Sequence, residues 1–410
     1  MAYGLLGLPL AFAALPLYVI LPNHYAREFG VPLATLGALL LAARLFDALV
    51  DPAIGRYTDG LFARSSRAVL ALGGVAALVL FAGFCLLFFP QVTGPDALAL
   101  WAGLMLLVTY AGYSTLSIAH QSWGAMLGGN EVQRSRVVAW REGLGLLGVV
   151  TASVLPSVLG LGVTAAAFGV MLLLGWLAWS ASIQPAPAVR RETGSVLLPF
   201  REPAFRRLLA VFMLNGIASA VPATLVLFFI QDRLQAPSDL EPIFLGSYFL
   251  AAALSIPLWL VVVKRLGLAR TWLVGMLISI AVFAWASQVA EGQFIAFGLI
   301  CALSGVALGT DLALPGALLA GVIQASGQSG RAEGAFFGWW NFATKLNLAL
   351  AAGLALPLLG AFGYVPGTRD AQALGALVAA YCLLPCLLKL AAAACLYVLV
   401  IRSPQKAQPR

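Results

Sequence analysis

Long apolar runs, separated by short polar stretches, follow one another along almost the whole chain. Each run has roughly the 20 residues that a helix needs to cross the hydrocarbon core of a bilayer. Because a backbone in lipid must satisfy its own hydrogen bonds, each run is predicted to be an α-helix. The pattern predicts twelve transmembrane helices, at residues 3–22, 32–56, 68–90, 97–127, 137–160, 162–183, 204–231, 241–263, 270–289, 293–320, 332–358 and 371–401.

The composition excludes a soluble domain. Of 410 residues, 61% are hydrophobic and 10% are charged, and the mean hydropathy is +0.95. These values are typical of an all-α membrane protein that crosses the bilayer many times. The formal net charge is +8, but the basic residues lie in short loops and form no patch with interleaved aromatics, so nucleic acid is not an expected partner. The five cysteines fall within apolar runs, with no spacing that favours a metal site.

The distribution of basic residues predicts the orientation. When the loops are assigned alternately to two sides, most of the Lys and Arg residues fall on one side, whereas Arg27, Arg233 and Arg369 fall on the other. Cytoplasmic loops carry the excess of Lys and Arg, so both termini are expected in the cytoplasm. Residues 1–22 lack a basic start and are interpreted as the first membrane helix rather than a signal peptide. We expect a multi-pass protein of the cell inner membrane.

A polar stretch in the middle of the chain predicts two halves. Residues 184–203, QPAPAVRRETGSVLLPFREP, carry prolines and charges and are interpreted as a cytoplasmic linker. The halves are then 1–183 and 204–402, each with six helices, followed by a cytoplasmic tail at 403–410. The same interval separates Pro16 from Pro222 and Arg64 from Arg270. Such repeats are typical of transporters whose substrate site lies between the halves near the midplane.

One apolar run carries a stripe of charges. Arg44, Asp47 and Asp51 lie three and four residues apart, so they share one helical face, and Pro52 follows and is expected to bend the helix. A charge at the bilayer centre costs roughly 2.5–3.5 kcal/mol, so these groups must face protein or a water-filled path. Two interpretations fit: a buried ion pair that joins helices, or two carboxylates that take up and release a coupling cation. We favour the second, because two acids with one arginine leave a negative charge to be neutralised.

The loop after this run carries a second pattern. Residues 55–67, GRYTDGLFARSSR, place Gly55 four residues before Asp59, and the bases Arg64 and Arg67 follow. This pattern resembles the loop signature of the major facilitator superfamily, whose members contain twelve helices in two pseudo-symmetric six-helix halves. A charged loop after a helix is often only solvated, but its position after the second predicted helix favours a conformational role.

Four stretches resemble a narrower family, the glycoside–pentoside–hexuronide cation symporters. They are ARLFDALVDPAIG (43–55), SIAHQSWGAMLGGNEVQRSRVVAWREG (117–143), LNGIASAVPATL (214–225) and RAEGAFFGWWNFATKLNLAL (331–350). The resemblance implies that Asp47 and Asp51 are cation-site acids, that Trp123 and Arg141 contact substrate, and that Lys345 is the central lysine. It covers both halves, and the same broad family includes carriers of lysophospholipids.

The sequence also departs from that family. Val50 replaces an asparagine that helps to hold sodium, and Ala11 and Ala119 replace two acids that bind sugar hydroxyls, with His120 beside the second. In the tenth helix, Gly321 and Gln324 replace acids that are common there. These losses disfavour a sodium site and galactoside recognition, so the expected coupling ion is a proton, and no cofactor or metal is expected.

Other polar groups in the apolar runs allow two interpretations each. Arg141, about one turn inside the predicted helix 137–160, is a snorkelling arginine or a substrate contact. His120 is a proton relay or a hydrogen-bonded structural histidine, and Trp123 stacks on substrate or packs between helices. Asp311 pairs with a neighbouring helix or acts in function. Lys389 is expected to extend to a lipid headgroup, without a functional role.

These observations favour a transporter over other classes of protein. No nucleophile elbow, phosphate loop or metal motif is present, which argues against an enzyme, and the polar groups are too localised for a channel lining. We expect a monomer in the lipid bilayer that couples cation entry, more readily of protons than of sodium, to symport of a sugar-like or anionic solute, a glycoside or hexuronide. The alternatives are a carrier of lysophospholipids or other amphiphiles and a proton-driven exporter. Arg141 and Lys345 favour a negatively charged solute, unless Lys345 only pairs with Asp47 or Asp51.

Overall fold

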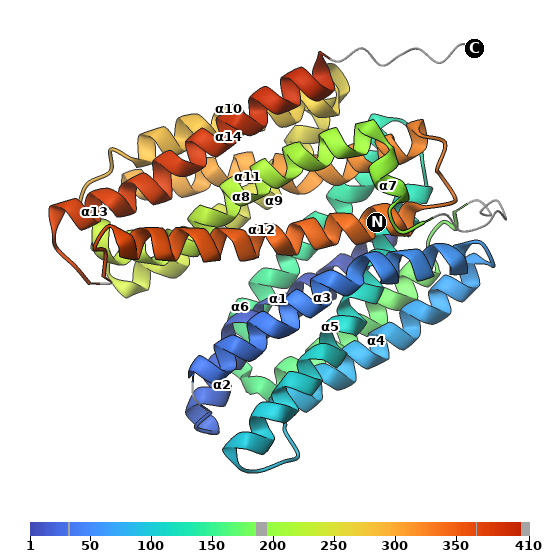
Figure 1. Cartoon of the computed structure of the whole chain (residues 1–410), viewed down its shortest axis with the longest axis horizontal. Helices are drawn as coiled ribbons and strands as arrows, with labels where there is room; N and C mark the ends of the chain where they lie inside the picture. Colours follow the sequence, from blue (N-terminus) through green and yellow to red (C-terminus); the bar gives the residue numbers. More distant parts are fainter. Residues whose placement is uncertain (32, 186–194, 366, 403–410) are drawn as a thin grey trace. The chain divides into compact units, whose positions relative to one another are not determined.

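The structure, a computed structural model, describes residues 1–31, 33–185, 195–365 and 367–402. It is 85% helical, and the described residues include no strand. The α-helices, in chain order (Figure 1), are α1 (Gly7–Leu15), α2 (Leu21–Glu28), α3 (Leu33–Phe62), α4 (Ser66–Phe88), α5 (Pro95–Met126), α6 (Glu131–Ser180), α7 (Leu198–Arg201), α8 (Pro203–Phe228), α9 (Glu241–Leu266), α10 (Leu268–Ala286), α11 (Phe294–Ala325), α12 (Glu333–Ala361), α13 (Ala371–Val378) and α14 (Leu384–Leu396).

Short 3₁₀- and π-helical turns extend or connect these helices. Two 3₁₀ turns, η1 (Tyr3–Leu6) and η4 (Ser238–Leu240), precede α1 and α9. Four π-helical turns, which have wider hydrogen-bonded rings, interrupt or end other helices. They are η2 (Pro16–Ile20), η3 (Phe229–Arg233), η5 (Ala379–Leu383) and η6 (Tyr397–Ile401).

The prediction of helices from apolar runs is confirmed. Every run predicted from the sequence coincides with helical structure, and nine helical stretches of the described residues are long and apolar enough to cross a membrane. The predicted helices 137–160 and 162–183 are joined in α6, where Gly160 breaks the helical geometry with φ 78° and ψ 168°. That left-handed conformation is readily adopted only by glycine, so the residue marks the turn between two spans. Helix α3 continues through Pro52 to Phe62.

The chain forms two compact units. The first unit contains Met1–Arg201 together with Ala320–Phe342, and the second contains Glu202–Leu319 together with Ala343–Arg410. The end of α11 and the start of α12 therefore belong to the first unit. Residues 186–194 of the predicted linker and the predicted tail at 403–410 lie outside the described residues.

Small residues let the helices of each unit approach closely. In the first unit, α1 packs along α6, and a Cβ added to Gly148 would lie 2.1 Å from the backbone oxygen of Leu8. In the second unit, a Cβ added to Gly305 of α11 would lie 2.1 Å from the backbone oxygen of Tyr248 in α9. Close backbone approach is how helices pack in a membrane, where lipid removes most of the hydrophobic driving force.

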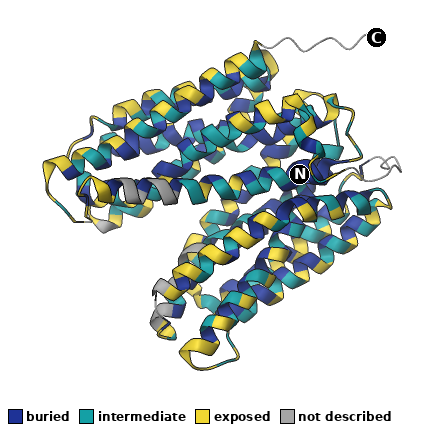
Figure 2. Cartoon of the chain, in the orientation of Figure 1, coloured by how far each residue is buried: buried dark blue, intermediate teal, exposed yellow. Residues whose placement is uncertain are grey.

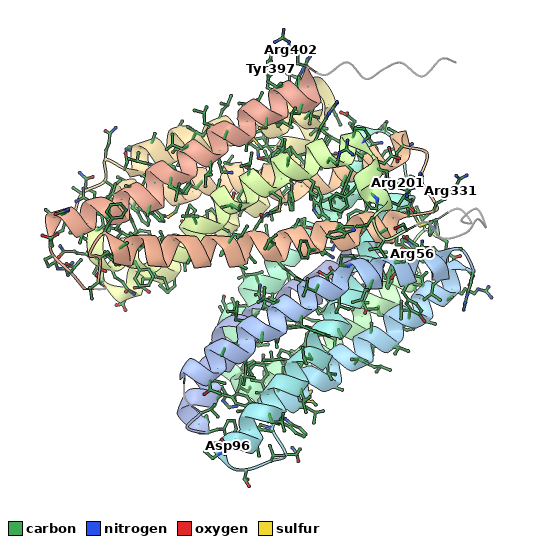
Figure 3. All side chains as sticks on the ribbon, in the orientation of Figure 1. Arg56, Asp96, Arg201, Arg331, Tyr397 and Arg402 are labelled. Carbon is green, nitrogen blue, oxygen red and sulfur yellow. The ribbon has the colours of Figure 1, made fainter. Side chains whose placement is uncertain are left out.

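Burial follows the helix faces in both units (Figure 2). In the described parts of the helices, buried and exposed positions lie on different faces, and large apolar side chains such as Leu49, Leu78 and Leu254 are exposed, as a lipid-facing surface requires. Charged residues gather at helix ends (Figure 3), with Asp96 in the first turn of α5 and Arg402 after η6. This arrangement agrees with the apolar runs and polar connections of the sequence.

Candidate functional site

Helix α3 places two carboxylates inside the first unit. Asp47 is 5% exposed and Asp51 is fully buried, whereas Arg44 is half-buried. The side of α3 that carries Leu45 and Leu49 is exposed, so the helix turns its acids inward and its leucines outward. The sequence pattern predicted this division, because three charges on one face cannot face lipid.

A hydroxyl from α5 holds one of these acids. Ser114 Oγ donates a hydrogen bond of 2.7 Å to Asp47 Oδ1. A hydroxyl is a neutral donor, so it orients the carboxylate without cancelling its charge. The geometry therefore fits a group that gains and loses a cation.

Asp59, further along α3, binds the start of α12. Its two carboxylate oxygens accept hydrogen bonds from the backbone N–H groups of Gly334 and Ala335, at 2.6 and 2.9 Å. The first N–H groups of a helix have no partner within the helix and carry partial positive charge, so they attract a carboxylate. The sequence analysis placed Asp59 in a conformational loop, whereas the structure places it in the last turn of α3, which ends at Phe62. Its carboxylate caps another helix.

Two glycines bring α3 and α12 together at this point. A Cβ added to Gly55 would lie 1.9 Å from the backbone oxygen of Gly334, and one added to Gly334 would lie 2.1 Å from that of Gly55. Any larger residue at either position would separate the helices and lengthen the bonds to Asp59. Arg64 and Arg67 are exposed at the other side of the loop, where Ser65 caps the start of α4.

Arg141 of α6 is paired with its neighbour in the chain. Its Nε and Nη2 both donate to Glu142 Oε1, at 2.9 and 2.6 Å. Adjacent side chains leave a helix in different directions, but these two long side chains meet at their charged ends. Helix α6 begins at Glu131, so Arg141 lies roughly 15 Å, nearly three turns, along it at 1.5 Å per residue. At that depth the flexible arginine folds back to neutralise both charges.

His120 and Trp123 of α5 pack in the core of the first unit. Both are fully buried. His120 Nε2 lies 2.7 Å from the backbone oxygen of Tyr3, whose ring stacks on the imidazole, and Trp123 Nε1 donates to the oxygen of Ile183 at 3.0 Å. Such contacts are typical of residues with a structural role in a protein core. A role of His120 and Trp123 in a substrate site stays a prediction. Lys345 is half-buried on α12, in the second unit.

The second unit contains a buried ion pair that the sequence interpretation missed in part. Lys389 of α14 lies 2.8 Å from Asp311 of α11, and its side chain is 5% exposed. Pairing with a neighbouring helix was one of the two interpretations of Asp311. The expectation that Lys389 reaches a headgroup is wrong, because its side chain turns inward to the carboxylate. The signal was available in the sequence as two opposite charges inside separate apolar runs.

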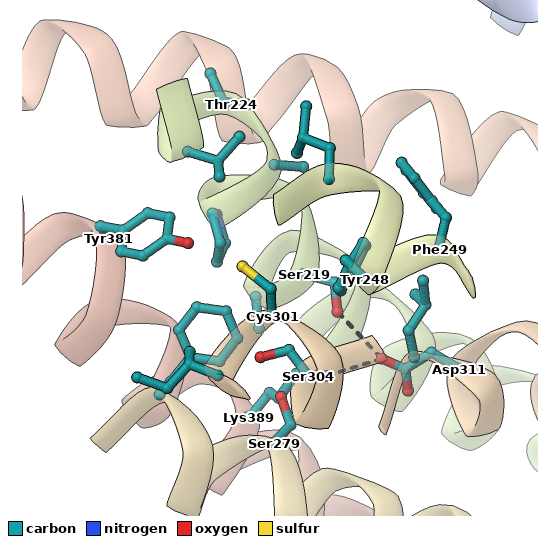
Figure 4. Close-up of a pocket in the computed structure, with 18 of the residues that line it drawn as sticks. Ser219, Thr224, Tyr248, Phe249, Ser279, Cys301, Ser304, Asp311, Tyr381 and Lys389 are labelled. Atoms are coloured by element: carbon teal, nitrogen blue, oxygen red, sulfur yellow. Dashed lines mark hydrogen bonds and ion pairs between the residues drawn. The ribbon is translucent and has the colours of Figure 1, made fainter. Parts of the chain in front are cut away.

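Three further helix side chains complete this polar cluster. Asn215 Nδ2 and Trp272 Nε1 donate to Asp311 Oδ1 at 3.0 and 2.8 Å, and Ser219 Oγ donates to Oδ2 at 3.2 Å. With Lys389, the carboxylate accepts four hydrogen bonds, about as many as its two oxygens hold. The cluster joins α8, α10, α11 and α14, and it lies at one end of a cavity of about 320 Å³ (Figure 4).

A polar cluster also joins the end of η3 to the loop before α13. Asp232 accepts hydrogen bonds from the Tyr364 hydroxyl and, at 3.0 Å, from the backbone N–H of Gly367. Burial and the neighbouring Asp232 carboxylate raise the pKa of Tyr364 above its usual value. Arg369 donates to the backbone oxygen of Asp232 at 3.0 Å. No pattern in the sequence predicted this contact, which links residues far apart in the chain.

Sequence comparison connects this arrangement with known transporters. The family model described as MFS/sugar transport protein matches residues 2–403. The chain is 24% identical over 384 residues to a protein of Bacillus subtilis (strain 168) described as an uncharacterized symporter, YjmB, with coverage of 87% of this chain and 82% of that protein.

Solved structures share the fold at low identity. A bacterial homologue of the iron transporter ferroportin, in an outward-facing state, has a TM-score of 0.75 at 16% identity and covers 98% of this chain and 99% of its own. A structure of the Escherichia coli fucose:proton symporter, FucP, has a TM-score of 0.71 at 16% identity, covering 97% and 98%. The human organic anion transporter MFSD10 has a TM-score of 0.65 at 17% identity, covering 96% and 98%. These likenesses show a major facilitator fold.

Proposed function

The chain belongs to the MFS/sugar transport protein family, and from this premise we propose that it is a proton-coupled symporter that carries a sugar-like solute across the cell inner membrane by alternating access. Membership of this family makes the protein a multi-pass secondary transporter and not an enzyme. The solute, the coupling ion and the direction of transport are parts of the proposal.

The observation that carries the proposal is the pair of buried carboxylates on α3. Asp47 and Asp51 lie one helical turn apart inside the first unit, so two groups able to bind a cation are held close together. A proton needs a single carboxylate, whereas sodium needs several oxygen ligands, and Val50 stands where the symporters that resemble this chain place an amide. The FucP structure is described as that of a fucose:proton symporter, which agrees with proton coupling on this fold.

We place the chain among the glycoside–pentoside–hexuronide cation symporters on the four stretches that resemble them, with both termini in the cytoplasm. Of the two solute classes left open by the sequence, a neutral sugar-like solute fits better than an anion. Arg141, one of the two bases on which the anionic interpretation depended, is already neutralised by Glu142 at 2.6 Å. An anionic solute would have to displace that carboxylate.

In an alternating-access cycle, Asp59 has the role of holding two helices together in one state. Its bonds to Gly334 and Ala335 tie α3 to the start of α12, and α12 continues into the second unit. We propose that these bonds hold the cytoplasmic ends of the helices together while the opposite side is open. When they break, α12 is released at its start, and the cytoplasmic side opens. Rigid-body movement of one repeat against the other is the usual mode of such transporters.

Proteoliposomes that contain the purified protein test the coupling. A pH gradient, acidic outside, is expected to drive accumulation of a neutral monosaccharide, and Asp47→Asn and Asp51→Asn are each expected to abolish accumulation while retaining exchange of solute for solute. Asp96→Asn, at an exposed position in the first turn of α5, is the control and is expected to transport normally. Accumulation that follows a sodium gradient at constant pH, or that persists in both variants, would refute the proposal.

A further inference from the structure

The cavity in the second unit is lined by buried hydroxyl groups that have no protein partner among the described residues. Tyr381, Ser279 and Ser304 are 5%, 5% and 8% exposed, and all three line the cavity. None of their hydroxyls forms a hydrogen bond with another described residue. Figure 4 shows the hydroxyls of Tyr381 and Ser304 directed toward the space between the lining side chains.

Unsatisfied hydroxyls of this kind indicate a polar occupant. The hydroxyls of Tyr381, Ser279 and Ser304 lie at the wall of the cavity, so water or a ligand inside it completes their hydrogen bonds. Each hydroxyl both donates and accepts, and the matching ligand groups are therefore themselves hydroxyls. Tyr248, half-buried on the same wall, adds a fourth hydroxyl of the same kind.

The charges beside the cavity favour a neutral occupant. Lys389 and Asp311 neutralise each other at 2.8 Å, and Asp311 already accepts four hydrogen bonds. The Lys389 ammonium uses two of its three N–H donors, on Asp311 and Asn215, and retains one for a ligand oxygen. An anionic ligand would compete with Asp311 for the Lys389 ammonium, and a cationic ligand would be repelled by that ammonium.

The size of the cavity and the residues that line it narrow the class of ligand further. Its volume, about 320 Å³, lies near the lower end of the roughly 300–1,000 Å³ that is usual for small-molecule sites, so it fits one ring and not an oligosaccharide. Phe249 and Phe283 line the same space as the hydroxyls. Aromatic faces of this kind pack against the C–H face of a sugar ring, while hydroxyl groups bind its edge.

We propose that this cavity, formed by α8, α9, α10, α11, η5 and α14, is the solute site of the second unit and binds a neutral polyhydroxylated ring of monosaccharide size. The inference rests on the proposed function, since it names the solute class of the same transporter. Ser304, Ser279, Tyr381 and Lys389 bind the ring hydroxyls. Asp311 is a positioning residue that orients the Lys389 ammonium.

Binding measurements on the full chain in detergent test this site. Isothermal titration with D-glucose, D-galactose, D-xylose and L-fucose, and with D-glucuronate and D-galacturonate, identifies the class that binds. At least one neutral sugar is expected to bind, and Tyr381→Phe and Ser304→Ala, which each remove one oxygen and preserve shape, are expected to raise its Kd by about tenfold. Tyr397→Phe, at a half-exposed position on η6, and Ser287→Ala, which removes a local bond at the end of α10, are the matched controls and are expected to leave the Kd unchanged.

Three results would overturn the inference: no neutral sugar of the panel binds, only the hexuronates bind, or both cavity variants bind as tightly as the parent. These results are separable from failure of the coupling proposal. Accumulation driven by pH with unchanged Kd in the cavity variants would refute this site alone. Tight binding of a neutral sugar without accumulation driven by pH would refute the coupling alone, because Asp47 and Asp51 are in the other unit.

Discussion

Replacing Lys389 by methionine leaves the stem of the side chain and removes its charge. Asp311 would then be a buried carboxylate without its counter-charge, and Asn215 Oδ1 would lose its donor. Breaking one partner of a buried ion pair usually costs about 3–5 kcal/mol. Asp311 retains three neutral donors, from Asn215, Trp272 and Ser219, so we expect a loss near the lower end, about 3 kcal/mol.

A double-mutant cycle separates the pair from its surroundings. The Lys389→Met/Asp311→Asn variant carries no buried charge, so it should recover at least about 2 kcal/mol of the loss caused by Lys389→Met, as coupled neighbours do. The free energy of unfolding is measured in dodecyl maltoside with increasing sodium dodecyl sulfate, followed by far-ultraviolet circular dichroism. Lys264→Met, at an exposed position near the end of α9, is the control and should change stability by less than about 0.5 kcal/mol. The reasoning fails if Lys389→Met costs no more than this control, or if the two substitutions are additive.

Three further changes test the first unit. Asp59→Asn should weaken the cap of α12. Hydrogen exchange with mass spectrometry should then show roughly tenfold faster exchange of the Gly334 amide, which is the fold-change expected for a cap worth about 1.4 kcal/mol. An unchanged exchange rate would contradict the role of Asp59 as the cap. Gly334→Ala should slow transport in proteoliposomes at least tenfold because its Cβ meets backbone at 2.1 Å, whereas Gly360→Ala, with nothing within 4 Å, should not; equal rates would exclude the close contact as a constraint. Arg141→Gln should destabilise the protein by about 3 kcal/mol in thermal and detergent unfolding, and Arg141→Gln/Glu142→Gln should destabilise it less. A double variant that is less stable than either single variant would show that the two charges do not stabilise each other.

The charged residues show which side-chain directions a pattern of polar and apolar positions can predict. The inward direction of Asp47 and Asp51 followed from one fact, that a helix in lipid cannot expose three charges on one face. The same fact applied to Lys389, but a long side chain has two ways to avoid lipid, toward a headgroup or toward a partner. Its direction depended on Asp311, which is on another helix. Arg141 and Glu142 meet although they are adjacent in the chain, because spacing describes where side chains begin and not where a long one ends.

The aromatic and hydroxyl side chains were out of reach for a different reason. Trp123 in the core and Tyr381 at the cavity are both aromatic residues in apolar runs, and no local signal distinguishes a ring that packs from one that lines a cavity. The hydroxyls of Ser279 and Ser304 come from different helices, α10 and α11, and each is ordinary by itself. Their convergence exists only after the helices have packed.

The sequence by itself determined the class of the protein, the positions of its helices and the inward face of α3, since each follows from hydrophobic free energy and backbone hydrogen bonding summed along a local stretch of chain. Only the tertiary structure decided which charges pair, that Asp59 caps the start of α12, and that hydroxyls without a partner among the described residues meet in the second unit. The physical reason is range: the transfer of a helix to lipid is fixed by its own residues, whereas a hydrogen bond forms or fails within about 3 Å. Which residues come that close depends on glycine contacts such as Gly55 with Gly334, between segments far apart in the chain.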